Sequence, residues 1–359
     1  MKRVYLLLAL ILAVPSYLVA QDDQPFKLGR FADGDHRYVG LVLDDSVVVD
    51  IAQANNALAG TKPAMPATMR GLIGRYDELR PRLGEIAAAA AAAGAGTQAA
   101  YIQDLGDVTI LPPIVPNIIY NAAANYSLHA AEMARRAARE AGGEVAPLPP
   151  APDPIPGIWE RSEDDIRQNP YIFLKSASTV IADGEAIRIP PQRTNLDWEC
   201  ELSAVIGRAA SRVSPEDASD YIFGYTLEND VSDRGGRGDG RMGSDWFLQK
   251  NHDTFGPFGP FIVPKEFVPD PHALTQTLTL SGTVMQDSNT GNMTHNTFDM
   301  LSYISHILTL RPGDALAMGS PSGVGTAREV PIYMQAGDTA VCTIESIGTL
   351  TNPVVGPQG

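Results

Sequence analysis

The stretch Asp197-Trp-Glu-Cys-Glu-Leu-Ser-Ala-Val-Ile-Gly207 decides how the central part of the chain folds. Apolar and polar residues alternate along it, which is typical of a β-strand because successive side chains of a strand point to opposite faces. One face would carry Trp198, Cys200, Leu202, Ala204 and Ile206. The other would carry Glu199, Glu201 and Ser203. The sequence therefore predicts a strand with one apolar face and two neighbouring carboxylates on the opposite face.

Those two carboxylates favour a metal site. Glu199 and Glu201 would repel each other unless a cation lies between them, and carboxylate oxygens are the ligands that a hard divalent ion prefers. Asp230, near the end of the β-rich run 221–234, could supply a third carboxylate to the same ion. Two simpler interpretations stay open, a solvated strand face for the glutamates and a turn-forming role for Asp230.

A candidate pair for proton transfer lies earlier in the chain. Ser127 can cap a predicted helix that runs to about Ala141. His129 and Glu132 stand at positions i and i+3 of that helix, so their side chains share one face. A carboxylate that orients an imidazole makes it a competent general base for activating water. The alternative is a solvated histidine beside an acidic residue that favours a helix N-terminus.

Lys250 is a further candidate, because it follows the aromatic residues Trp246 and Phe247 and precedes the turn 255–260. A partly buried lysine could stabilise an enolate oxygen, whereas an ordinary surface lysine is the alternative. The nearby stretch 238–243 matches G-x-G-x-x-G, but it lacks the preceding strand and the following helix of a dinucleotide-binding fold. We therefore expect no dinucleotide at that stretch.

Composition limits the class of protein. The chain has 359 residues with 27 basic and 42 acidic side chains, a formal net charge of −15 at pH 7, which argues against a nucleic-acid partner. Hydrophobic residues make up 44%, enough for a globular core. Two cysteines, Cys200 and Cys342, exclude a disulfide framework and a cysteine-based zinc site. Because Cys200 falls on the apolar strand face, we interpret it as a buried thiol and do not expect a bridge to Cys342.

The N-terminus is typical of an export signal. Lys2 and Arg3 precede the apolar run 4–14, and residues 1–20 end before a polar segment. A stable membrane span needs roughly 18 apolar residues, so this run predicts a secretory signal rather than membrane insertion. Asn125 begins a glycosylation sequon inside the His129 motif, where a sugar would block the site. We therefore predict export to a bacterial periplasm.

Two domains are expected after the signal, a small N-terminal α+β domain over 21–115 and a catalytic domain over 116–359. The first would contain a hairpin around Asp44-Asp45, a helix over 69–82 and an alanine-rich helix over 85–101 with a loose end. The second would contain the helix that begins at Ser127, a proline-rich surface excursion over 145–157 and an amphipathic helix over 298–308.

The order of these pieces from about 114 to 354 resembles the fumarylacetoacetate hydrolase family. Each short string is weak alone, but their common order is specific. The strings that carry the resemblance are Asn125-Tyr126 with His129 and Glu132, the stretch 171–175, Glu199-x-Glu201, Gly224-Tyr225, Asn229-Asp230-Val-Ser-x-Arg234, Lys250 with Asp253-Thr254, Gly259-Pro260, Leu310-x-Pro-Gly-Asp314, the glycine-rich stretch 319–325, and the ending 337–352.

The resemblance implies an α+β fold whose catalytic domain is a mixed β-roll, usually in a homodimer. It implies Mg²⁺ or Mn²⁺ on Glu199, Glu201 and Asp230, and a water-activating pair on a lid helix that matches His129 and Glu132. It also implies substrate contacts for the residues that match Tyr126, Lys175, Lys250, Arg234 and Ser320. Leu128 and Arg237 depart from the family pattern of aspartate and glutamine at those positions, which affects substrate identity more than metal binding.

The function expected from this resemblance is hydrolysis of a carbon–carbon bond in a small 2,4-dioxo acid, such as an acylpyruvate or a fumarylacetoacetate-like compound, through a metal-stabilised enolate. His129, held by Glu132, would activate the water, and the lid helix would close over the site. The same site could instead decarboxylate or isomerise a 2-oxo acid. An alternative from another class is an exported protein that binds metal and organic acid without turnover.

Overall fold

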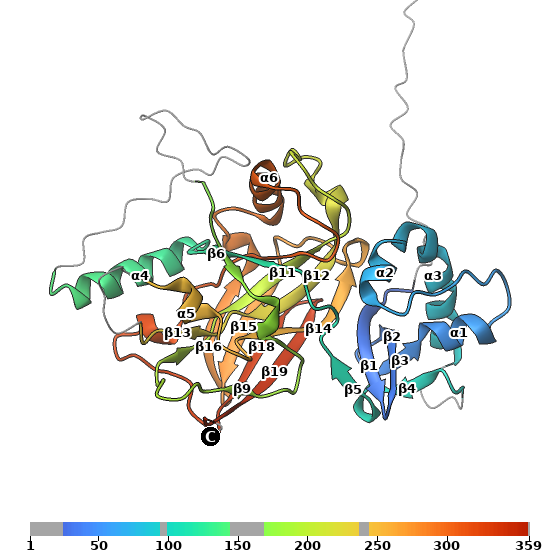
Figure 1. Ribbon diagram of the computed structural model, residues 1–359, viewed down its shortest axis with the longest axis horizontal. Coiled ribbons are helices and arrows are strands. Elements are labelled where there is room, and N and C mark those ends of the chain that lie inside the picture. Colours follow the sequence, from blue (N-terminus) through green and yellow to red (C-terminus); the bar gives the residue numbers. More distant parts are fainter. Residues whose placement is uncertain (1–23, 94–98, 144–168, 237–243, 358–359) are drawn as a thin grey trace, which may run out of the picture.

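The computed structural model describes residues 24–93, 99–143, 169–236 and 244–357. The predicted export signal, the proline-rich excursion at 145–157 and the stretch 238–243 lie outside these residues. A smaller lobe with helices α1 to α3 lies beside a larger body of β-strands, as Figure 1 shows. Within the described residues, no helix is long and apolar enough to cross a membrane.

The predicted hairpin of the smaller lobe is confirmed. Asp44 and Asp45 have φ angles of 48° and 50°, the left-handed values that a two-residue hairpin turn needs. The strands of the lobe are β1 (Lys27–Asp33), β2 (His36–Leu43), β3 (Val47–Asp50), β4 (Ile102–Asp104) and β5 (Thr109–Leu111). Their apolar residues pack on three helices, α1 (Ile51–Ala57), α2 (Met69–Ile73) and α3 (Tyr76–Ala93).

One helix prediction in this lobe is wrong in detail. The segment 69–82 forms two helices, because the N–H of Arg75 bonds to the carbonyl of Leu72 rather than to the carbonyl four residues back. That tighter bond ends α2, and a new helix begins at Tyr76. The alanine-rich segment continues α3 to Ala93, and residues 94–98 are outside the described part.

A twelve-stranded sheet joins the lobe to the larger body, and its central path runs β4-β3-β2-β1-β14-β12-β11-β17-β6-β7. Leu28 of β1 pairs with Ile262 of β14 across the junction. Strands from both sides of the predicted domain boundary at 115/116 thus belong to one sheet. The boundary itself stays a prediction. The additional strands are β6 (Ile119–Ala123), β7 (Tyr171–Lys175), β8 (Val180–Ile181), β11 (Cys200–Ile206), β12 (Ile222–Asn229), β14 (Gly256–Pro264) and β17 (Ala315–Ala317).

A second, five-stranded sheet in the order β16-β15-β18-β19-β9 packs against the first. Its strands are β9 (Ile187–Arg188), β15 (Thr275–Leu280), β16 (Thr283–Asn289), β18 (Thr339–Ile344) and β19 (Gly348–Val355). A short pair, β10 (Leu196–Asp197) and β13 (Ser232–Asp233), flanks the site described below. Parallel pairs such as β17–β6 and β19–β9 occur among antiparallel ones. The predicted fold class, an α+β chain with a mixed β-roll, is confirmed.

The larger body carries three helices, α4 (Ser127–Glu140), α5 (Trp246–Lys250) and α6 (Thr297–Ile307). The predicted helix over 298–308 is α6, and Asn296 and Asp299 form a capping box at its start. The helix predicted from Ser127 is α4, but the proposed cap is wrong. Tyr126 holds the N-cap position in extended backbone, and Ser127 is already the first helical residue.

The expectation of a free thiol at Cys200 is also wrong, because Cys200 and Cys342 form a disulfide with a Cα–Cα distance of 5.5 Å. The apolar face of β11 meets the second sheet, as predicted, and both cysteines lie in that shared core. Cys342 belongs to β18 and faces Cys200 across the interface between the sheets. The disulfide therefore connects β11, at the residue between Glu199 and Glu201, to the opposite sheet.

Candidate metal centre and active site

The structure brings the three predicted carboxylates together. One oxygen from each of Glu199, Glu201 and Asp230 lies within 4.8 Å of the others, and all three side chains are buried. Strands β11 and β12 are antiparallel, and the N–H of Asp230 donates to the carbonyl of Glu199 at 2.8 Å. Burial rules out a solvated strand face, and the convergence explains why Asp230 does more than form a turn. Three carboxylates at this spacing fit a hard divalent cation such as Mg²⁺ or Mn²⁺.

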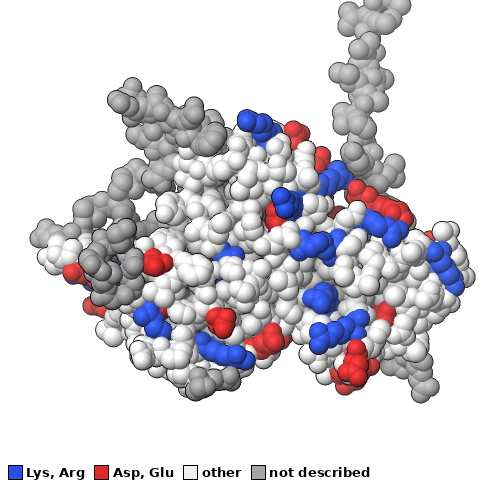
Figure 2. Space-filling model, in the orientation of Figure 1, with Lys and Arg blue, Asp and Glu red and all other residues white. Residues whose placement is uncertain are grey.

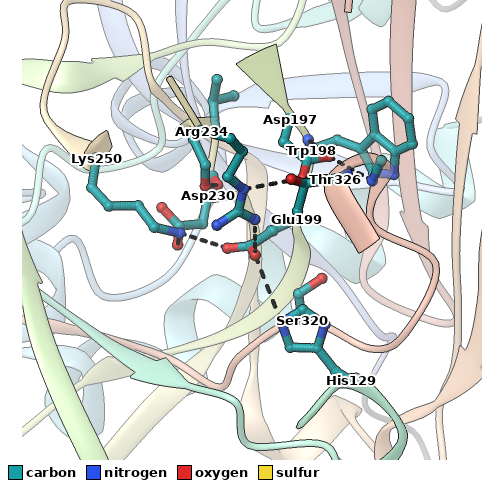
Figure 3. A network of polar contacts seen from close by, with 12 residues as sticks. His129, Asp197, Trp198, Glu199, Asp230, Arg234, Lys250, Ser320 and Thr326 are labelled. Atoms are coloured by element: carbon teal, nitrogen blue, oxygen red, sulfur yellow. Dashed lines mark hydrogen bonds and ion pairs between the residues drawn. The ribbon is translucent and has the colours of Figure 1, made fainter. Parts of the chain in front are cut away.

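Two cationic side chains hold Glu199 in its ionised form. The Lys250 ammonium donates to Glu199 Oε2 at 2.6 Å and also to Asp230. The guanidinium of Arg234 donates to Glu199 Oε1 at 2.5 Å and to Asp197 at 3.1 Å. Burial acts to raise the pKa of Glu199, but these two cations outweigh it and hold that pKa well below its usual range. Figure 3 shows Lys250 and Arg234 converging on Glu199.

Glu201 has the opposite electrostatic environment. Burial and the neighbouring carboxylates of Asp230 and Glu228 raise its pKa well above the usual value. Its Oε2 accepts a hydrogen bond at 2.9 Å from the N–H of Gly319. Gly319 has a φ of +84°, and a Cβ there would lie 2.9 Å from the Cβ of Asn125, so glycine permits this approach. The excess of buried negative charge around Glu201 is what a divalent cation would offset.

Lys175 is buried and is not among the residues that line the cavity of the site. Its Nζ lies 2.5 Å from Asp230 Oδ1, 3.7 Å from Glu228 Oε1 and 2.6 Å from the carbonyl oxygen of Phe255, to which it donates. The side chain is fully buried behind the carboxylates. Lys175 therefore positions Asp230, and the substrate contact that the resemblance implies for it stays a prediction.

Tyr126 is also buried away from the cavity. It is 1% exposed, it does not line the cavity, and its hydroxyl donates to Gln276 Oε1 at 2.9 Å. As the N-cap residue of α4 it lies where the chain leaves the sheet, and its ring fills the core there. The substrate contact that the resemblance implies for Tyr126 stays a prediction.

His129 and Glu132 form the predicted pair. The His129 Nδ1 lies 2.8 Å from Glu132 Oε1, and its Nε2 lies 3.8 Å from Glu199 Oε1. An ionised carboxylate only accepts hydrogen bonds, so the contact with Glu132 calls for a proton on Nδ1 and leaves Nε2 facing Glu199. Figure 3 shows His129 approaching Glu199 from the side opposite Arg234. The pair thus places a proton acceptor beside the carboxylate triad.

A cavity of about 400 Å³ connects these groups. Ser320 lines it as predicted for a substrate contact, and the Ser320 hydroxyl accepts a hydrogen bond from Gln286 at 2.7 Å. The residues that line the cavity are Ala122, Ala123, Ala124, His129, Met133, Arg136, Ala137, Glu140, Phe173, Glu199, Glu201, Arg234, Ser244, Trp246, Gln249, Lys250 and Ser320. Two carboxylates of the triad, Glu199 and Glu201, therefore share one cavity with His129, Arg234 and Lys250. Asp230 and Glu132 contact these groups but are not among the residues that line it.

The sequence analysis missed three residues of this region. Asp197 accepts hydrogen bonds from the N–H groups of Gly325 and Thr326 and from Arg234, so it fixes that guanidinium. Burial and the nearby Asp230 raise the pKa of Glu228 to about 7, against the lowering effect of Lys175. Glu228 could have been found, since it stands two residues before Asp230 and is paired with Glu201 across the strands. Arg136, the third, lies seven residues after His129 on one helix.

Figure 2 shows lysine and arginine among acidic and uncharged residues on the face in view. The absence of a nucleic-acid partner stays a prediction from the net charge of −15.

Comparisons with known proteins define the family. The family model described as "Fumarylacetoacetate (FAA) hydrolase C-terminal" matches residues 118–355. Oxaloacetate tautomerase YisK of Bacillus subtilis (strain 168) is 30% identical over 332 residues, which cover 90% of this chain and 99% of that protein. Oxaloacetate tautomerase fahd2, mitochondrial, of Xenopus laevis is 40% identical over 193 residues, 53% of this chain and 59% of that protein. The match thus spans about three fifths of the frog protein.

A solved structure gives the same result. Maleylpyruvate hydrolase from Sphingobium sp. SYK-6, in complex with manganese (II) ion and pyruvate, has a TM-score of 0.63 at 27% identity and covers 92% of this chain and 100% of that one. The β-roll, the buried triad and the matched family model define a class of enzymes. The chain belongs to the fumarylacetoacetate hydrolase family.

Proposed function

We propose that this protein interconverts the keto and enol forms of a small 2-oxo acid with the help of a divalent metal. The observation that carries the proposal is the position of His129 Nε2, a proton acceptor 3.8 Å from an oxygen of the carboxylate triad. A 2-oxo acid held at the triad would present the carbon beside its carbonyl group to this base. Two relatives named oxaloacetate tautomerases support the same reaction.

A divalent cation held by Glu199, Glu201 and Asp230 would supply the positive charge that polarises the 2-oxo group and makes the adjacent carbon acidic. Nε2 of His129 would take the proton from that carbon and return it to the oxygen, or the reverse. Glu132 accepts from the other ring nitrogen and stabilises the imidazolium that forms between the two transfers. No water is consumed in this scheme.

Hydrolysis of a 2,4-dioxo acid is the second candidate, and the His129–Glu132 pair favours it as well. The same Nε2 could take a proton from water, whose oxygen adds to the distal carbonyl carbon. The carbon–carbon bond then breaks, and its electron pair passes into the enolate of the 2-oxo acid. Lys250 and Arg234, which already contact the triad, lie where they can offset the enolate charge. The structural neighbour from Sphingobium is named a hydrolase.

One assay separates the two reactions. The ultraviolet absorbance of enol-oxaloacetate is followed with and without Mg²⁺ or Mn²⁺, and acetylpyruvate cleavage is measured by the pyruvate that it releases. We expect metal-dependent loss of the enol signal without pyruvate release, and loss of activity in His129→Ala and Glu201→Ala. Glu329→Ala is the matched control, since Glu329 is exposed and away from the cavity.

Three other outcomes would change the assignment. Pyruvate released from acetylpyruvate at a rate that exceeds tautomerisation would favour the hydrolase. Carbon dioxide released from oxaloacetate would favour a decarboxylase. Metal binding without turnover of either compound would favour the exported binding protein.

Two further properties are proposed on the sequence and the family. The family resemblance implies a homodimer, which sedimentation of the purified protein measures. The N-terminal signal implies export, and the N-terminal sequence of the exported protein shows whether residues 1–20 have been removed.

A further inference from the structure

One face of the lid helix α4 forms a wall of the cavity. The residues that it contributes are His129, Met133, Arg136, Ala137 and Glu140. Their spacing of three or four residues places them on one side of the helix. His129 and Arg136 are seven residues apart, or about 10 Å along the axis at about 1.5 Å per residue. Arg136 therefore lies well beyond His129, away from the carboxylate triad that His129 approaches.

Arg136 differs from the other two cations of the cavity in what it contacts. Lys250 and Arg234 are already paired with carboxylates of the metal centre and with Asp197. Arg136 is paired with Glu140, its neighbour on the next helical turn, at 2.8 Å. The Glu140 side chain is 62% exposed, and a pair of this kind contributes little because water screens it. A carboxylate of a ligand can therefore replace Glu140 at little cost.

Part of the cavity wall is apolar, and Glu140, Glu199 and Glu201 line the rest together with the cations and polar residues. Ala122, Ala123, Ala124 and Met133 line the same cavity and carry no charge. The Arg136 side chain is 22% exposed, so it is partly shielded from water, which strengthens a pairing with an anion. A planar guanidinium binds a carboxylate through two parallel hydrogen bonds.

We infer that Arg136 forms a second anion subsite that binds the distal carboxylate of the substrate, so that the enzyme acts on 2-oxo dicarboxylic acids. The inference rests on the proposed function, in which the 2-oxo acid end lies at the triad. The two ends of one substrate would then be held by different elements. The 2-oxo acid end would lie at the triad beside β11 and β12, and the distal carboxylate would lie at α4. Binding of a diacid would also hold α4 over the cavity.

The test compares Arg136→Met with Arg135→Met on oxaloacetate and on its 4-methyl ester, which lacks the distal charge. Arg135 is the matched control, because it is exposed on the same helix and does not line the cavity. Loss of one charge-assisted pairing, about 1.5–3 kcal/mol, corresponds to a rise in KM of roughly 10- to 100-fold. We expect this rise for Arg136→Met with oxaloacetate only, and no change with the ester or in Arg135→Met.

Calorimetric titration with 2-oxoglutarate and with pyruvate, both in the presence of Mn²⁺, gives a second readout that needs no turnover. Wild-type protein should bind the diacid more tightly, and Arg136→Met should bind both acids with similar affinity. An equal rise in KM for oxaloacetate and for its ester in Arg136→Met would overturn the inference. A preference for 2-oxoglutarate that persists in Arg136→Met would overturn it as well. Absence of turnover together with an Arg136-dependent diacid preference would retain the subsite and reject the proposed reaction.

Discussion

The main-chain N–H of Gly323 donates to both carboxylate oxygens of Glu132, at 3.1 and 3.0 Å. This contact fixes the carboxylate that in turn accepts from His129. Gly323 has a φ of +105°, and a Cβ at this position would lie 2.2 Å from the carbonyl oxygen of Met285. The glycine-rich loop therefore approaches the lid helix at a point where only glycine fits. It sets the orientation of the general base from outside the helix that carries it.

We expect Glu132→Gln to lower kcat by roughly 10²- to 10⁴-fold, the usual contribution of a positioned acid–base group. The amide keeps the shape of the side chain but removes the charge that stabilises the imidazolium. The midpoint of thermal unfolding should change little, because the amide keeps an oxygen that can accept from the N–H of Gly323. Steady-state kinetics and a melting curve measure the two effects. A variant with full kcat would show that His129 acts without Glu132.

Gly323→Ala should lower kcat as well, but through a different cause. The added methyl group forces the loop away from Met285 and removes the hydrogen bonds to Glu132. We therefore expect loss of stability together with loss of activity. Gly236→Ala is a suitable control, because it also has a positive φ, at 65°, but has no atom within 4 Å of the added Cβ. If both alanine variants lose activity equally, backbone strain and not the contact with Glu132 would be the cause.

Lys250→Met should change metal binding and stability in opposite directions. The ammonium contacts Glu199 and Asp230, two of the three carboxylates of the triad, so it competes with a bound cation. Its removal should tighten Mn²⁺ binding in a titration. Without metal the variant should unfold at a lower temperature, because buried carboxylates lose their counter-charge. Weaker Mn²⁺ binding in the variant would mean that Lys250 supports the ion and does not compete with it.

Lys175 is a further buried cation at the site, and its removal should be costly. It is fully buried between Asp230 and Glu228, and breaking such a pair costs about 3–5 kcal/mol because it leaves a charge uncompensated. We expect Lys175→Met to lower the free energy of unfolding in urea by about that amount. Adding Glu228→Gln should recover part of the loss. No recovery in the double variant would show that Asp230 alone depends on Lys175.

The carboxylate triad could be predicted from the sequence, because it depends only on the alternation of side chains along one strand and on a residue at the end of the next. Alternation placed Glu199 and Glu201 on one face, and an antiparallel partner strand returns Asp230 to the same point. The roles of Lys175 and Tyr126 could not be predicted in this way. Whether a side chain reaches a cavity or fills the space behind it depends on how β7 and α4 pack, and residue spacing carries no information about that packing.

The elements of the fold follow the same division. The hairpin at Asp44-Asp45 and the helix α6 depend on local turn and capping chemistry, and both were predicted. The break between α2 and α3 arises from a single tighter hydrogen bond, which the apolar spacing of 69–82 does not reveal. The partner of Cys200 lies 142 residues away on another sheet. The pairing of the two cysteines therefore depends on the tertiary arrangement, which local sequence does not reveal.

The disulfide supplies the last prediction. It joins residues 142 apart in the chain, and a crosslink over a long loop typically stabilises a protein by about 2–4 kcal/mol, chiefly by restricting the unfolded chain. We expect Cys200→Ser together with Cys342→Ser to lower the free energy of unfolding by about that amount. Because Cys200 lies between Glu199 and Glu201, weaker Mn²⁺ binding should accompany the loss.

The same crosslink connects to the predicted export, since disulfides persist in oxidising compartments and are rare in the cytoplasm. Protein recovered from the periplasm should therefore take up no thiol-alkylating reagent before reduction and two equivalents after it, one for each cysteine of the chain. Mass spectrometry of the alkylated protein measures this directly. Protein made without residues 1–20 and retained in the cytoplasm is the control, and it should be labelled without reduction. Two labelled thiols in the exported protein would contradict the crosslink, and an unchanged stability of the double serine variant would show that the sheets hold together without it.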